Sequence, residues 1–111
     1  MNAENRQLIQ LLRSIARLAL PADDQLAYLA GIGVGDLADE LALDLDDATA
    51  LGERLGFTPA ELELVARLEQ LLDDLTETRT EQTWRAEGLR TDPRWEQTRL
   101  VAREFLFRQG Q

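Results

Sequence analysis

Carboxylates are the most abundant side chains in this sequence that could do chemistry. Two sets of acids recur at the three- and four-residue spacing of one helix face: Glu69, Asp73, Glu77 and Glu81, and Asp36, Glu40, Asp44 and Asp47. Either set could hold Mg²⁺ for phosphate hydrolysis, because this cation prefers oxygen ligands. Such a site needs acids that face inward beside a phosphate-binding base, whereas the first set falls among polar neighbours. We therefore interpret both sets as solvated surface and keep a magnesium-dependent all-helical hydrolase as a further alternative.

Several residue types on which enzymes rely are missing. The chain has no Cys and no His, and all 12 of its basic residues are Arg. Imidazole proton transfer, thiol chemistry, a Lys Schiff base and a Ser–His pair are therefore excluded. Zinc would lack its usual nitrogen and sulfur ligands, and a phosphate-binding loop would lack its Lys. We predict a protein without catalytic activity, metal or cofactor.

The net charge of −9 is unevenly distributed along the chain. Residues 1–22 and 88–111 each carry a net charge of +2, while residues 23–87 hold 17 acids and four arginines, a net −13. The basic ends could fold back onto the acidic middle, or bind the acidic middle of a second copy.

Length and composition indicate one helical domain over residues 1–111, because Leu, Ala, Glu and Arg dominate and Val, Ile and Tyr are scarce. The N-terminus has no signal-peptide pattern, and no apolar run approaches the roughly 20 residues that cross a membrane. We expect a cytoplasmic protein without a membrane partner.

Apolar spacing predicts a compact all-α bundle of about five to six helices. The first helix is expected over 3–20, ended by Pro21, and the second over 22–30. A turn made by three alternating glycines should follow: Gly31, Gly33 and Gly35.

The acidic middle is expected to contain two short helices. One should span 37–43 with Asp36 as its N-cap, and the next 47–55, with a turn or a weak junction at 44–47 between them. 

Two later helices have clear start signals. Thr58 and Glu61 form a capping box, with Pro59 at the first helical position, and this helix should reach at least Leu75. The pattern fades over 76–83, where the helix either frays or continues, and Gly88 should break the run. Asp92 caps the last helix, which Pro93 starts and which ends at about Arg108.

Residues 34–54 resemble the generic helix-turn-helix of bacterial transcription factors. Leu37 and Ala38 match the "LA" of its first helix, and Ala42 stands at the turn, where that family usually has Gly. Four further positions match its inward-facing residues: Leu41, Leu43, Ala48 and Leu51. The resemblance implies a tri-helical unit over 22–56 whose second helix, DDATALGERL, would enter the DNA major groove.

The acidity of this second helix argues against DNA binding. Its exposed positions offer one Arg against three acids, whereas neutralisation of phosphates by basic residues supplies much of DNA affinity. We expect no nucleic-acid partner; a DNA-binding regulator whose Arg94, Arg99 and Arg103 touch phosphate stays a further alternative. The acidic face is either plain surface or a protein-docking site, and its candidate residues are Asp36, Asp39, Glu40, Asp46, Asp47 and Glu53.

Aromatic residues near the C-terminus supply the second set of interaction candidates: Trp84, Trp95, Phe105 and Phe107. Core packing is the alternative for both Trp residues. Phe105, Leu106 and Phe107 cannot all be buried on one narrow helix face, so one of them should meet a neighbouring segment or a second chain.

We hypothesise a small acidic helical protein-interaction module that self-associates, as a homodimer, because a thin core gains burial by association. The alternative is an acidic inhibitor or immunity-type protein that mimics nucleic-acid charge and docks on a basic protein partner.

Overall fold

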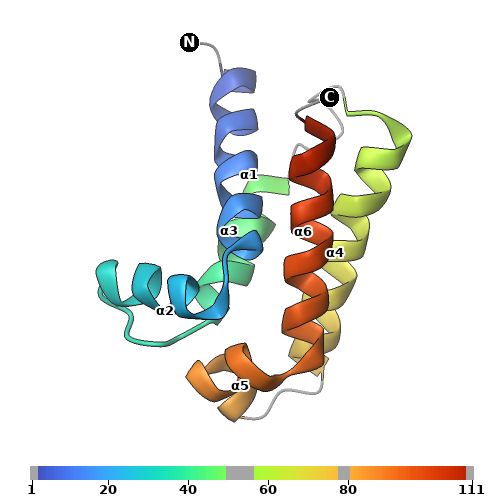
Figure 1. The fold of residues 1–111 in the computed structure, drawn as a ribbon. Helices are drawn as coiled ribbons and strands as arrows, with labels where there is room; N and C mark the ends of the chain where they lie inside the picture. Colours follow the sequence, from blue (N-terminus) through green and yellow to red (C-terminus); the bar gives the residue numbers. More distant parts are fainter. Residues whose placement is uncertain (1–2, 50–56, 78–80, 110–111) are drawn as a thin grey trace.

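The computed structural model describes residues 3–49, 57–77 and 81–109 of the chain. No strand occurs in these ranges, which confirms the all-α bundle of about five to six helices (Figure 1). The described residues form six α-helices and one short 3-10 helix: α1 (Ala3–Ala19), α2 (Ala22–Gly31), α3 (Asp39–Thr49), α4 (Pro59–Glu77), η2 (Glu81–Trp84), α5 (Ala86–Thr91) and α6 (Pro93–Gln109).

Three long helices form one layer of the bundle. α6 lies between α1 and α4 and contacts both of them (Figure 1). α6 runs in the opposite direction to its two neighbours, so α1 and α4 run parallel to each other on either side of it. α3 packs against α1 behind this layer, and α5 contacts the end of the bundle where α6 begins.

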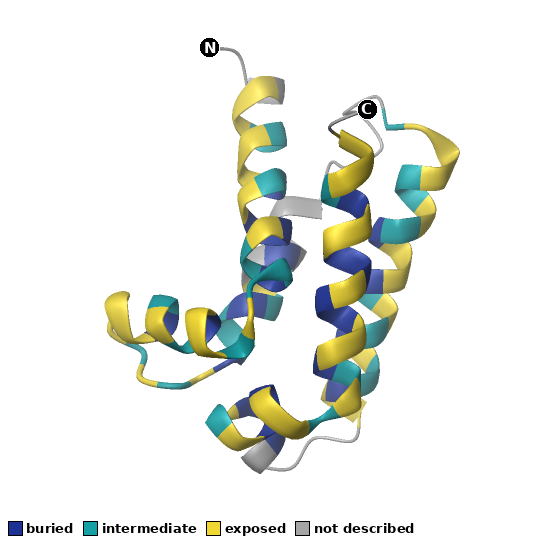
Figure 2. Cartoon of the chain, in the orientation of Figure 1, coloured by how far each residue is buried: buried dark blue, intermediate teal, exposed yellow. Residues whose placement is uncertain are grey.

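The core is one cluster of apolar side chains contributed by all the helices. α1 buries Leu11, Ile15 and Leu18, which recur at helical spacing, and α6 buries Trp95 and Phe105. Figure 2 shows the buried residues of α6 facing its neighbours and its exposed residues facing outward. Each such large side chain contributes about 1.5–3 kcal/mol by its burial, so these stripes decide which face of each helix turns inward.

The two predicted helix starts are confirmed by their hydrogen bonds. The Glu61 N–H donates to Thr58 Oγ1 at 3.2 Å, and the Thr58 N–H donates to Glu61 Oε1 at 2.8 Å. These reciprocal bonds hold the pKa of Glu61 below its ordinary value. At the start of α6, the Arg94 N–H donates to Asp92 Oδ1 at 2.9 Å. Both pairs supply partners for amides that a helix N-terminus leaves unpaired.

The predicted division into two helices by a turn or a weak junction at 44–47 is wrong, because α3 is one helix from Asp39 to Thr49. Leu41 and Leu45 lie four residues apart and are both buried, so one continuous face packs on the core. This packing overrides the low helix propensity of the Asp run. Ala42 therefore lies inside a helix, and the turn implied by the helix-turn-helix resemblance is absent; the last part of the unit, 50–56, lies outside the described residues.

The glycine turn is confirmed, and the break at Gly88 is wrong. Gly33 and Gly35 have φ of 82° and 68°, in the left-handed region that favours glycine. Gly88 is buried inside α5, which continues to Thr91. Its neighbour Leu89 is fully buried, so packing against the core keeps this short helix intact despite the glycine.

The sequence leaves open whether the helix that starts at Pro59 frays or continues over 76–83, and the structure answers this in part. α4 ends at Glu77, and Glu81 starts the 3-10 helix η2. The helical ladder of carboxylates from Glu69 therefore does not extend to Glu81. Within the described ranges, no helix is both long and apolar enough to cross a membrane.

Candidate functional site

A cluster of buried polar groups surrounds Arg99 of α6. Its guanidinium is almost fully buried, and it donates to Gln25 Oε1 of α2 at 3.2 Å, to Glu96 Oε2 at 2.9 Å and to the carbonyl oxygen of Leu89. Gln25 Nε2 in turn donates to the carbonyl oxygens of Arg17 and Leu18, each at 3.1 Å. The cluster joins α1, α2, α5 and α6.

The charge of this cluster is compensated by helix ends. The carbonyl groups of Arg17, Leu18 and Leu89 belong to the last turns of α1 and α5, which carry partial negative charge. A third donor, Arg103 Nε, reaches the carbonyl oxygen of Ala19 at 2.8 Å. We assign Arg99 and Gln25 a structural role, because apart from the pair with Glu96 inside α6 their bonds join one helix of the bundle to another.

The arginines expected to touch phosphate in a DNA-binding alternative are engaged within the fold. Arg94 donates to both carboxylate oxygens of Asp92, with Nη2 2.7 Å from Oδ2, and to the carbonyl oxygen of Asp74. These bonds lower the pKa of Asp92 and raise the pKa of Arg94. Arg99 is buried and Arg103 holds the end of α1.

The predicted acidic candidates do not form one described patch. Asp36 is not the N-cap of the helix after it, since α3 begins at Asp39. Its carboxylate instead accepts from Arg85 Nη1 at 2.8 Å and from the Ala86 N–H, the first residue of α5, at 2.9 Å. These two contacts, the backbone bond foremost, lower the pKa of Asp36.

The remaining acidic candidates lie on or after α3. Asp39 and Glu40 are half-buried in its first turn. The side chains of Asp46 and Asp47, and residue Glu53, lie outside the described residues. Among the residues that the structure does describe, no group of three or more carboxylates is arranged to hold a metal ion.

Both Trp candidates are core residues. Trp84 and Trp95 are buried and pack edge to face, with ring centroids 5.8 Å apart. Trp95 Nε1 donates to the carbonyl oxygen of Thr83 at 2.9 Å, which satisfies its polar group inside the core.

The Phe-Leu-Phe segment divides as the sequence predicts. Phe105 is fully buried against Phe57, Leu106 is half-buried, and Phe107 leaves 69% of its surface exposed.

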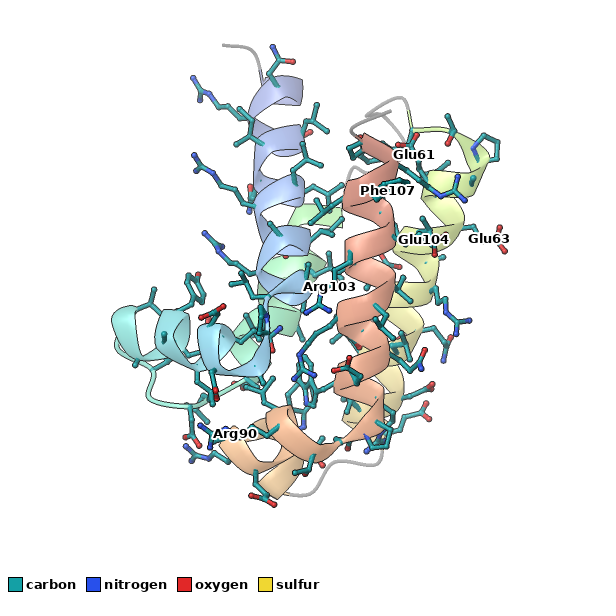
Figure 3. The ribbon with its side chains drawn as sticks, in the orientation of Figure 1. Glu61, Glu63, Arg90, Arg103, Glu104 and Phe107 are labelled. Carbon is teal, nitrogen blue, oxygen red and sulfur yellow. The ribbon has the colours of Figure 1, made fainter. Side chains whose placement is uncertain are left out.

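Leu100, seven residues before Phe107 and therefore on the same face of α6, is 47% exposed. In Figure 3, Arg103 lies on the α1 side of this face and Glu104 on the α4 side. The outer face of α6, defined by Leu100, Arg103, Glu104 and Phe107, is an apolar centre between two opposite charges.

The outer face of α1 is basic. It lies opposite the buried Leu11 and Leu18, and it surrounds a shallow hollow of about 410 Å³. We call its residues the arginine strip: Arg6, Ile9, Gln10, Arg13 and Arg17. Arg17 stacks on the Tyr28 ring, 4.6 Å from its centroid, while Arg6 and Arg13 are exposed and form no ion pair with another described residue.

The outer face of α4 is acidic. Glu63 and Glu77 are two seven-residue repeats apart, and Asp73 lies one turn before Glu77; all three are exposed and lie opposite the buried Leu68 and Leu72. Figure 3 shows Glu63 directed away from the bundle, on the side opposite α1. We call Glu63, Gln70, Asp73 and Glu77 the acidic strip; Arg67 lies at its edge.

Sequence reasoning missed the Arg99 cluster; it identifies Arg6, Gln10, Arg13 and Arg17 as one face of the first helix, either solvated or a docking strip for the acidic middle, but not the hollow on that face. A signal for the cluster existed, since Arg99 lies within the apolar stripe formed by Trp95, Ala102 and Phe105. The three arginines of α1 were visible as a face, but their hollow depends on the conformations of their side chains.

Comparison with protein-family models, with curated proteins and with solved structures gives no match for this chain, so its function is argued from these surfaces.

Proposed function

We propose that the protein is a non-catalytic interaction module that pairs with a second copy through the outer face of α6. The observation that carries this proposal is Phe107, a large aromatic side chain that is 69% exposed although it belongs to the central helix of the bundle. A single exposed apolar residue is ordinary, but here Leu100 lies on the same face.

The composition of the face also supports pairing. Protein interfaces are enriched in aromatic residues and Arg, with an apolar centre and a polar rim. Phe107 and Leu100 form such a centre, and Arg103 and Glu104 form the rim on its two sides. Two copies of this face are self-complementary, because Arg103 of one copy can lie opposite Glu104 of the other.

The test compares two exposed apolar residues on different helices. Phe107→Ser should weaken the dimer by about 2 kcal/mol or more for each copy, as expected for an aromatic anchor. The matched control is Leu43→Ser on α3, where the side chain is 52% exposed; it should leave the dimer unchanged. Light scattering after gel filtration, over a range of protein concentrations, gives the mass of each species.

A wild-type chain that stays monomeric at every concentration would overturn the proposal. Equal loss of the dimer in both variants would also contradict it, because the effect would then not belong to α6.

A further inference from the structure

We infer that the arginine strip of α1 is a docking surface for the acidic strip of α4 on a second copy. This contact is distinct from the α6 pairing, since the two strips lie on the flanks of the bundle. It joins two different surfaces, so it links copies head to tail and does not close after two of them.

The first argument is charge complementarity. The arginine strip has two exposed arginines, Arg6 and Arg13, and no acid lines its hollow among the described residues. The acidic strip presents three exposed carboxylates, with Arg67 as the basic residue at its edge. Because opposite charges steer and align two surfaces, the arginine strip of one copy attracts the acidic strip of another. Two arginine strips, or two acidic strips, repel each other.

The second argument is the direction of the helices. α1 and α4 run parallel on opposite sides of α6 (Figure 1). A second copy displaced sideways and along the helix axis, without rotation, therefore places the end of its α4 beside the outer face of α1 of the first copy, with the two helices parallel. In that arrangement the two exposed arginines of the strip, Arg6 and Arg13, can face the exposed carboxylates of Asp73 and Glu77.

The third argument is the form of the two surfaces. The hollow on α1 is bordered by long side chains and by Ile9, so a carboxylate entering it would contact guanidinium groups and an apolar floor. The acidic strip has Ala66 beside Glu63 and Gln70, which leaves room for the arginine side chains of the other copy. The contact is weak and salt-sensitive, because exposed ion pairs contribute little each.

The experiment isolates this contact from the α6 pairing by using Phe107→Ser as the common background. In low salt and at high protein concentration, sedimentation equilibrium should show reversible association beyond the monomer. Raising the salt concentration should remove it, since screening shortens the range of the attraction.

Charge reversal gives the decisive comparison. Asp73→Arg with Glu77→Arg changes the net charge from −9 to −5 and so lowers general repulsion between copies. General repulsion therefore predicts stronger association, whereas our inference predicts association at least about tenfold weaker, because the two reversed charges repel the arginines that they attracted. The matched control reverses Asp23 and Glu87, two exposed acids that belong to neither strip, and gives the same net charge; it should not weaken association.

Complementation completes the test. We expect no self-association of a chain with Arg6→Glu and Arg13→Glu, and none of the chain with Asp73→Arg and Glu77→Arg. An equimolar mixture of these two chains should form a complex. Association of the Asp73→Arg, Glu77→Arg chain at the level of its parent, or a mixture that stays monomeric, would overturn the inference. The α6 pairing is tested in chains that retain Phe107, so either idea can fail alone.

Discussion

At the scale of single residues, Arg99 is the clearest case of a charge placed inside the fold. Its side chain is 4% exposed, and its partners come from α2, from the end of α5 and from its own helix. A buried guanidinium is tolerated only when its donors are satisfied, and here helix carbonyl groups supply part of the negative charge.

Replacement of Arg99 by Met should destabilise the protein by about 2–4 kcal/mol. The Met side chain keeps much of the apolar stem but leaves Gln25 Oε1 and the Leu89 carbonyl oxygen without this donor in a dry environment. Arg90→Met is the matched control, because Arg90 is 55% exposed and pairs with the exposed Asp23; its effect should stay within about 0.5 kcal/mol. Urea unfolding followed by circular dichroism measures both.

Asp92 makes the stability of the fold depend on pH. Its bonds from Arg94 hold its pKa below the ordinary value of 3.8, so the folded state binds this proton less readily than the unfolded chain. The stabilisation is therefore fully present well above pH 3.8 and is lost as the pH falls through that value and below it. Asp92→Asn should be less stable than wild type at pH 7 and should lose less stability between pH 5 and pH 3.

Urea midpoints at a series of pH values test this expectation. Asp73→Asn serves as the control, since Asp73 is an exposed carboxylate on α4. A variant at position 92 whose pH profile is parallel to that of wild type would contradict the assignment.

At the scale of helices, the capping box at the start of α4 has a separate measurable effect. Thr58→Ala removes the acceptor of the Glu61 N–H and should cost about 1 kcal/mol. Thr76→Ala, near the end of the same helix, removes a bond from Thr76 Oγ1 to the Leu72 carbonyl oxygen. This hydroxyl competes with a backbone N–H for the same carbonyl oxygen and so adds little stability. The second variant should therefore be neutral or slightly stabilising. Equal losses in thermal unfolding of the two variants would rule out a specific role for the cap.

The helices that could be predicted from the sequence are those with local signals. α1, α4 and α6 have apolar stripes of four or more turns together with proline or capping residues, and their bounds were expected within two residues. α3 was expected as two helices, because its Asp residues have low helix propensity and the burial of Leu45 is not visible locally.

The partner of Asp36 shows why the polar contacts could not be predicted as the helices could. A capping acid was recognised, but it binds the start of α5, fifty residues away in sequence, and not the helix that follows it. Pairings over such separations depend on how the helices pack, which apolar spacing alone does not determine. The exposure of Phe107 was accessible from the sequence, because it follows from the width of one helix face.

At the scale of the whole molecule, the surface is divided among the three long helices. α1 presents arginines, α6 presents Leu100 and Phe107, and α4 presents carboxylates, each on its outward side. A net charge of −9 keeps copies apart in general, so contacts between them must be local and oriented. The two proposed contacts are of this kind: the apolar contact should survive high salt, and the charged contact should not.

The central position of α6 also affects how the chain folds during its synthesis. α6 separates α1 from α4 and packs against both, so the leucine faces of these two helices have no complete partner until residues 93–109 leave the ribosome. The bonds from Arg99 to Gln25 and from Arg103 to Ala19 bridge 74 and 84 residues, and they too must wait. We expect the nascent chain to stay uncompacted until its last described helix is free and then to fold in one cooperative step.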